Sequence, residues 1–236
     1  MSIAGNIEVI RNKIFASASK AKINPSEVII VCVSKNRIID EIHQALDAGI
    51  EHIGESRIQE AQSKYAALRE YVRDTDIALK LHLIGHLQTN KVSKALDMFD
   101  LIQSVDSLRL SERIDALARD RSINVDIMVE VNTSEEKLKF GVKSESAVDL
   151  LKGISVLENI RVCGLMTMAP LSSDKESARP YFRRLRELRD KINEIEDPLF
   201  RDRVSIDFLS MGMSQDYEVA VEEGANMLRI GTAIFE

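Results

Sequence analysis

Long apolar runs are absent from this sequence. No stretch approaches the roughly 18 consecutive apolar residues of a membrane-spanning helix, and residues 1–25, which include Glu8, Arg11 and Lys13, lack the apolar core of a signal peptide. Cysteine is also scarce, because Cys32 and Cys163 are the only two, and each is placed inside an apolar run. Such sparse cysteine is more typical of a reducing compartment than of a disulfide-bonded secreted protein. We therefore expect a soluble, cytoplasmic protein.

An excess of basic residues is missing too. The net charge at pH 7 is −6, from 32 lysines and arginines against 38 aspartates and glutamates. This balance argues against nucleic acid or an anionic membrane as the main partner. It also means that any bound phosphate group needs a local set of donors, because the overall charge of the protein repels an anion.

The short motifs of several enzyme classes are lacking. The sequence has no G-x-S-x-G elbow, Walker loop or G-x-G-x-x-G, so acyl transfer and nucleotide binding lose their usual signals. His82 and His86 are four residues apart, but Gly85 lies between them and the segment reads as a strand followed by a turn. With no carboxylate at ligand spacing and no third histidine nearby, we expect no metal site here.

What the sequence does contain is a regular alternation of short apolar runs and amphipathic segments. Eight runs have the length and composition of buried strands: 28–34, 51–54, 79–85, 100–105, 124–132, 160–168, 205–212 and 226–231. Apolar residues recur at helical spacing over 3–22, 57–72, 107–120 and 180–195. Eight strands separated by helices predict an α/β fold, a single (β/α)8 TIM-type barrel with an extra N-terminal helix, as one domain over residues 1–236. An open doubly wound parallel sheet is the alternative.

Function in a parallel barrel gathers at the carboxyl ends of the strands. We expect Lys35 at the end of the first strand, facing inward, where loss of water would free its amine for imine formation. On its own, however, a lysine at such a position is more often a surface residue that begins a loop. The seventh run ends in Leu209-Ser210-Met211-Gly212-Met213-Ser214, with a glycine and two hydroxyl groups, and the eighth ends in Gly231-Thr232. Glycine turns with hydroxyl groups suit a phosphate. Because the loops after strands seven and eight form the usual phosphate site of such barrels, we favour an anion site there over two ordinary turns.

Seven segments of the sequence, in order, resemble one protein family. They are VSKN (33–36), HIGESRIQEAQSK (52–64), LHLIGHLQTNK (81–91), FGV (140–142), GLMTMAP (164–170), LSMGMSQDYEVAVEEGA (209–225) and LRIGTAIF (228–235). These segments are similar to those of the pyridoxal phosphate homeostasis proteins, which resemble the barrel domain of alanine racemase without its second domain. One departure is Ser56, where the family usually has asparagine in G-E-N, so a shorter hydroxyl group replaces an amide at this position.

The resemblance implies that this chain binds pyridoxal 5′-phosphate (PLP). Lys35 would hold the cofactor as a Schiff base, and Arg229 would face the pyridine nitrogen. Met166 would lie against the ring region, and His82 would line the pocket wall. The residues implied for the phosphate are Ser210, Gly231 and Thr232, together with the backbone of Met211.

The same resemblance implies a carrier of PLP rather than a catalyst. Arginine stays protonated, so Arg229 would keep the pyridine nitrogen unprotonated and make the ring a weaker electron sink. Racemisation also needs a second acid or base on the opposite face of the substrate, which in alanine racemase is a tyrosine of the second domain. The tyrosines of this sequence all fall on expected helices or helix starts: Tyr65, Tyr71, Tyr181 and Tyr217. We therefore expect a protein of intracellular PLP homeostasis that holds PLP and supplies or buffers it, not an enzyme.

Two alternatives stay open at this point. One is a fold-type III PLP enzyme that acts on amino acids, in the manner of a racemase. The other is a cofactor-free Schiff-base aldolase or a barrel that binds sugar phosphates. The expected partners are PLP and the PLP-dependent apoenzymes that would receive it, with no nucleic acid and no membrane, and the expected state is a monomer.

Overall fold

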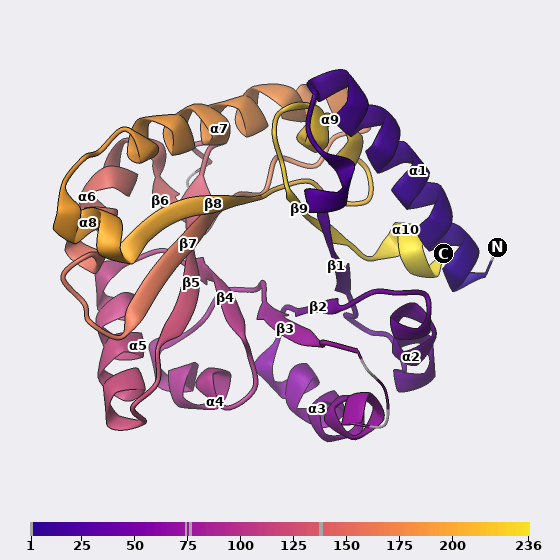
Figure 1. Ribbon diagram of the computed structural model, residues 1–236, viewed down its shortest axis with the longest axis horizontal. Helices are drawn as coiled ribbons and strands as arrows, with labels where there is room; N and C mark the ends of the chain where they lie inside the picture. The colour runs from indigo at the N-terminus through magenta and orange to yellow at the C-terminus, as the bar shows by residue number, and fades with distance from the viewer. Residues whose placement is uncertain (1, 74, 76, 137–138) are drawn as a thin grey trace.

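Eight parallel strands form a closed barrel in the computed structural model, which describes residues 2–73, 75, 77–136 and 139–236 (Figure 1). The strands are β1 (Ile29–Val33), β2 (His52–Glu55), β3 (Lys80–Leu83), β4 (Leu101–Val105), β5 (Val125–Asn132), β7 (Ile160–Met166), β8 (Val204–Ser210) and β9 (Met227–Ile230). A short strand, β6 (Val142–Lys143), pairs with the end of β5 and is not one of the eight. All eight strands predicted from the apolar runs are confirmed.

Two pairings decide between a barrel and an open sheet. β4 pairs with β5 through Leu101 opposite Asp126 and Ile102 opposite Ile127. β9, the last strand, pairs over its whole length with β1, the first, from Ile29 opposite Met227 to Cys32 opposite Ile230. An open doubly wound sheet would leave two edge strands, so the (β/α)8 barrel predicted from the sequence is confirmed.

Helices surround the barrel and alternate with its strands (Figure 1). They are α1 (Ile3–Ala21), α2 (Ile39–Asp47), α3 (Ile58–Arg73), α4 (Val92–Leu96), α5 (Leu108–Asp120), α6 (Ala147–Ile154), α7 (Arg179–Asn193), α8 (Pro198–Arg203), α9 (Tyr217–Glu222) and α10 (Thr232–Phe235). Short 3-10 helices precede some of them: η1 (Pro25–Glu27), η2 (Thr89–Lys91), η3 (Ser144–Ser146) and η4 (Lys175–Ala178). The four helices predicted from helical spacing correspond to α1, α3, α5 and α7.

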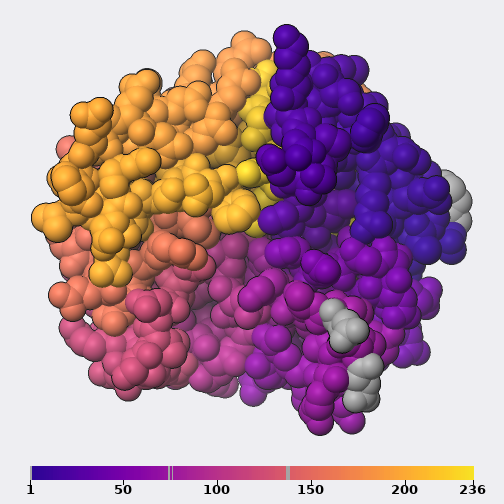
Figure 2. Space-filling model, in the orientation of Figure 1, coloured from indigo at the N-terminus to yellow at the C-terminus, as the bar shows by residue number. Residues whose placement is uncertain are grey.

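The extra N-terminal helix, α1, lies outside the barrel and joins the two ends of the chain. Ser2 caps it, because the Ser2 hydroxyl accepts a hydrogen bond of 3.1 Å from the Gly5 amide. One buried face of α1 packs against α9 and α10, and the Asn6 side chain donates a 2.9 Å hydrogen bond to the Ile234 carbonyl. Figure 2 shows the result at the surface, where the indigo N-terminal segment meets the yellow and orange C-terminal segment.

Two apolar layers hold the barrel together. The larger layer lies between the strands and the surrounding helices. The smaller one fills the barrel interior with Val31, Leu101, Met128, Cys163, Met166 and Met227. Burial of these side chains is the main stabilising contribution to such a fold. It leaves the polar side chains of the interior grouped together, as described below.

The described part of the chain also bears on the expected setting. Every helix in it is too short or too polar to cross a lipid bilayer. Both cysteines are free and buried, and burial raises the pKa of each thiol to about 12, so neither is poised to react.

Candidate functional site

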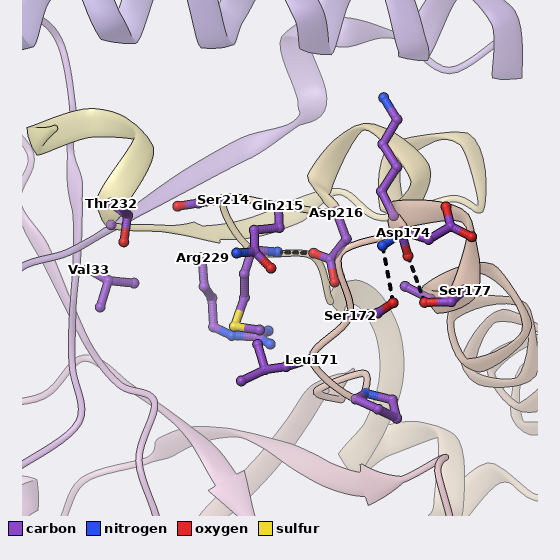
Figure 3. A pocket seen from close by; sticks show the side chains of 15 residues that line it. Val33, Leu171, Ser172, Asp174, Ser177, Ser214, Gln215, Asp216, Arg229 and Thr232 are labelled. Carbon is purple, nitrogen blue, oxygen red and sulfur yellow. Dashed lines mark hydrogen bonds between the residues drawn. The ribbon is translucent and has the colours of Figure 1, made fainter.

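A pocket of about 300 Å³ opens at the carboxyl ends of β1 and β9 and between the segments that follow β7, β8 and β9 (Figure 3). Such a volume suits a small ligand. One side of the pocket is formed by Val33 and by residues of the turns after β8 and β9, and the other by the segment 170–178 after β7. The lining side chains that carry a charge or a hydroxyl group are Ser172, Asp174, Lys175, Ser177, Ser214, Asp216, Arg229 and Thr232.

Free hydrogen-bond donors gather where β9 ends. The main-chain amides of Gly231 and Thr232 have no acceptor among the described residues. The Ser214 hydroxyl accepts a 3.1 Å hydrogen bond from the Ala233 amide, which leaves the hydroxyl proton of Ser214 free to donate. Together with the hydroxyl of Thr232, these groups form a cradle of uncharged donors that suits a phosphate group.

Arg229 brings a positive charge to the same pocket. Its side chain is almost completely buried, and Nη1 donates to the Ser210 hydroxyl at 2.7 Å while Nη2 donates to the Thr167 carbonyl at 2.8 Å. Burial lowers the pKa of Arg229 to about 10, and the Glu130 and Asp216 carboxylates oppose that shift. The guanidinium is therefore charged at neutral pH and can only donate hydrogen bonds to a ligand.

Lys35 lies in the turn directly after β1, at the carboxyl end of the barrel as expected. The expected inward orientation is not observed, because the Lys35 side chain is exposed and does not line the pocket, whereas Val33 does. An ammonium group without a partner is more stable in water than in an apolar interior. The amine would have to turn inward to reach a ligand in the pocket.

The turn that carries Lys35 is held by a group of charged side chains. Lys64 donates to the Ser34 carbonyl at 2.6 Å and to Glu55 and Glu60 at 2.9 Å each. Glu60 accepts a 2.5 Å hydrogen bond from the amide of Asn36, whose φ of 59° is in the left-handed region. Burial raises the pKa of Glu55, and the bonds from Ser34 and Lys64 oppose that rise. These contacts fix the backbone on both sides of Lys35.

Four of the eight expected contact residues are buried and do not line the pocket: His82, Met166, Ser210 and Met211. The Ser210 hydroxyl donates to Gln103 Oε1 at 2.6 Å, below Arg229 in the barrel interior. His82 contacts Gln103 and His52, and burial together with nearby positive charge lowers its pKa to about 3. The Met211 amide donates to the Met227 carbonyl at 3.1 Å within the barrel. Their roles as cofactor contacts stay predictions, although Ser210 accepts a hydrogen bond from Arg229, a residue of the pocket wall.

Sequence reasoning included the Ser214 hydroxyl in the turn after the seventh strand but assigned it no contact, and it missed Asp216. Both residues lie in the segment LSMGMSQD (209–216), in which Ser210 was the hydroxyl residue favoured as a phosphate contact. Gly212 has a φ of 93°, a conformation that glycine adopts without strain, and the turn it makes directs the following residues toward the pocket. The Asp216 carboxylate accepts a 2.6 Å hydrogen bond from the Met213 amide and thereby shapes this turn.

Glu130 is a second residue that the sequence did not single out. It lies on β5 opposite Met166 and is 3% exposed. Burial raises the pKa of its carboxyl group to about 7, Asp106 adds to the rise, and Arg229 opposes it. A carboxyl group that titrates near neutral pH and interacts electrostatically with Arg229, a residue of the pocket wall, is able to give or take a proton.

The comparisons with known proteins agree on one family. The family described as alanine racemase, N-terminal domain, matches residues 4–236. A pyridoxal phosphate homeostasis protein of Aquifex aeolicus is 41% identical over 194 residues, which cover 82% of this chain and 80% of the relative. Another, of Vibrio alginolyticus, is 35% identical and covers 99% of this chain and 97% of its own. The solved structure of PipY of Synechococcus elongatus with PLP bound has a TM-score of 0.81 and 32% identity, with full coverage of both chains.

Proposed function

We infer the function of this chain from its family, since it belongs to the alanine racemase N-terminal domain family and, within it, to the pyridoxal phosphate homeostasis proteins. The chain is accordingly a PLP-binding protein of PLP homeostasis. The observation that carries this conclusion is the pocket in which free amides, two hydroxyl groups and the buried Arg229 converge within a protein of net charge −6. A phosphate ester with a pyridine ring fits that combination of donors.

The residues present fit PLP at three points. The phosphate dianion would lie in the cradle of Gly231, Thr232 and Ser214, where several donors share its charge. The ring nitrogen, an acceptor, would face the Arg229 guanidinium, which can only donate. Lys35 follows the strand whose Val33 lines the pocket, so a rotation of its side chain would bring the amine to the same space.

We assign the expected contacts to these roles. The aldehyde of PLP supplies an electrophile that a lysine amine can attack, and Lys35 is the amine in our assignment. Gly231, Thr232 and Ser214 hold the phosphate, with the turn at Met211 shaping the cradle. Ser210 acts through Arg229, and the remaining two assigned residues, Met166 and His82, support the pocket from inside the barrel.

We propose that the chain carries PLP without turning over amino acids. Because the pKa of Arg229 is about 10, the guanidinium keeps its proton at neutral pH and does not give it to the pyridine nitrogen, and an unprotonated ring is the weaker electron sink. The relatives named above are described as homeostasis proteins and not as enzymes. The recipients we propose are PLP-dependent apoenzymes, and we propose that residues 1–236 act as one PLP-binding domain in the cytoplasm, as a monomer.

One observation favours the alternative, a fold-type III enzyme that acts on amino acids. Glu130 is a buried carboxyl group with a pKa near 7 and lies within electrostatic range of Arg229. It is therefore a candidate for the acid or base that the sequence did not provide.

Deuterium exchange separates the two functions. The PLP-loaded protein is incubated with L-alanine or D-alanine in D2O, and exchange and inversion at the α-carbon are followed by NMR beside free PLP and heat-denatured protein. A carrier gives no more exchange than free PLP and restores activity to an apoenzyme when mixed with it. Exchange with inversion at a rate far above that of free PLP would establish the enzyme instead, provided that this activity is lost in Glu130→Gln.

A further inference from the structure

A continuous chain of hydrogen bonds crosses the barrel interior and ends at Arg229. It links five strands through His52 on β2, His82 on β3, Gln103 on β4, Ser210 on β8 and Arg229 on β9. The successive distances are 2.9 Å between the two histidines, 2.7 Å from His82 to Gln103, 2.6 Å from Gln103 to Ser210 and 2.7 Å from Ser210 to Arg229. Only His52, at the amino-terminal end of the barrel, is partly exposed.

All bonds of this chain run in one direction, and Arg229 sets it. A guanidinium has no acceptor, so the Ser210 hydroxyl must accept from Arg229 and give its own proton to Gln103 Oε1. The Gln103 amide nitrogen then donates to His82 Nδ1. His82 is left with its proton on Nε2 and donates to His52 Nδ1.

Gln103 is the residue that joins the two halves of this hydrogen-bond chain, Arg229 and Ser210 on one side and the two histidines on the other. Its side chain is completely buried, its oxygen is engaged by Ser210, and its nitrogen contacts His82 and, at 3.2 Å, the Met227 sulfur. The surrounding interior layer is apolar, so packing alone would accept leucine or methionine at this position. A buried amide in such a place is stable only because every bond is made, and each bond fixes a neighbour.

We propose that Gln103 is a positioning residue for the PLP site, which holds Ser210, and through Ser210 the Arg229 guanidinium, in the orientation that faces the pyridine nitrogen. This inference rests on the proposed PLP binding. It extends the binding site to an interior side chain that does not line the pocket. Without Gln103, the Ser210 proton loses its acceptor, and Arg229 keeps the Thr167 carbonyl as its one fixed partner among those described.

The test compares PLP with its 1-deaza analogue, in which carbon replaces the ring nitrogen. We expect the unchanged protein to bind PLP at least about tenfold more tightly than the analogue, because a hydrogen bond to a charged donor contributes about 1.5–3 kcal/mol. Gln103→Leu is expected to remove this preference, because it should weaken the binding of PLP and leave the binding of the analogue nearly unchanged. Met128→Leu, a change in the same interior layer, serves as the packing control and should keep the preference.

Gln103→Glu separates positioning from simple loss of packing. A carboxylate still accepts from Ser210, so the preference for PLP should persist, while His82 must now place a proton on Nδ1. Nitrogen-15 NMR of the ligand-free protein reads this directly: we expect the proton of His82 on Nε2 in the unchanged protein and on Nδ1 in Gln103→Glu.

Three outcomes would overturn the proposal. The first is a proton on Nδ1 of His82 in the unchanged protein. The second is an equal loss of binding affinity for PLP and for the analogue in Gln103→Leu, and the third is loss of the preference for PLP over the analogue in Gln103→Glu. If Gln103→Leu does not fold, the NMR measurement and Gln103→Glu still decide. Failure of the unchanged protein to bind either ligand would instead refute the proposed function. The nitrogen-15 spectra would still show which nitrogen of His82 carries the proton, and so the direction of the hydrogen bonds.

Discussion

The Lys64 ammonium group donates a 2.6 Å hydrogen bond to the carbonyl oxygen of Ser34, the residue immediately before Lys35. Through this bond, a helix residue of α3 fixes the end of β1 at the point where the proposed reactive lysine begins. Lys64 also neutralises Glu55, whose side chain is 2% exposed. The position of Lys35 therefore depends on a lysine that has no contact with the pocket.

Removal of this lysine is expected to destabilise the protein strongly. Lys64→Met leaves the buried Glu55 carboxylate without its cation, which should lower the free energy of unfolding by about 3 kcal/mol or more. Urea unfolding measures the change. Lys20→Met is the control, because Lys20 forms an exposed pair with Glu222 and its loss should cost less than about 1 kcal/mol. Equal effects of the two substitutions would contradict this account, and Glu55→Gln should rescue Lys64→Met in part.

Lys35→Ala is expected to abolish covalent attachment of PLP while weak binding through the phosphate survives. Borohydride reduction of the PLP-loaded protein, followed by mass spectrometry of its peptides, should find the reduced adduct on Lys35. Lys175 is the nearest rival, because it lines the pocket and pairs with Glu218 at 3.1 Å. Lys175→Ala should keep the adduct, and an adduct mainly on Lys175 or Lys64 would refute the assignment.

Thr232→Val is expected to weaken PLP binding by roughly 10–150-fold, the equivalent of one lost hydrogen bond to a charged group. The binding of inorganic phosphate should weaken in parallel, because the proposed contact of Thr232 is with the phosphate group of PLP. Ser214→Ala tests the same cradle from the other segment. Thr89→Val, at a threonine outside the pocket, provides the matched control for titration. Unchanged affinity in Thr232→Val would remove this residue from the site.

Glu130→Gln is expected to change how stability depends on pH. The pKa of Glu130 rises from 4.5 to about 7 in the folded protein, so between these values the folded state binds more protons than the unfolded state. The free energy of unfolding contributed by this group therefore falls as pH increases from about 4.5 to about 7, by at most about 3 kcal/mol. Glutamine does not titrate, so the variant should gain stability relative to the unchanged protein above pH 7 and not at pH 4.

Urea unfolding of the ligand-free protein at several pH values measures this difference. Glu135→Gln is the control, because Glu135 is exposed and its pair with Arg184 lies at the surface. A stability difference between Glu130→Gln and the unchanged protein that is the same at pH 4 and pH 8 would show that Glu130 does not titrate as described.

The sequence alone determined the order and nature of the elements. Each apolar run became a strand whose ends differ from the predicted ones by at most two residues. The physical reason is that parallel strands covered on both faces need continuous apolar runs, which are local features of the sequence. The carboxyl-end placement of Lys35, Gly231 and Thr232 followed from the same pattern, because topology puts all strand ends of a barrel on one face.

Only the tertiary structure decided which side chains meet. A strand that is apolar on both faces does not reveal which residues point inward, so nothing local distinguishes Ser210, bound in the interior, from Ser214, beside the pocket. The pKa of Glu130 and the bonds of Gln103 likewise come from burial and from partners on other strands, far away in the sequence. Burial and hydrogen bonding between distant segments arise when the barrel closes, and they decide the chemistry of residues whose identity the sequence already fixes.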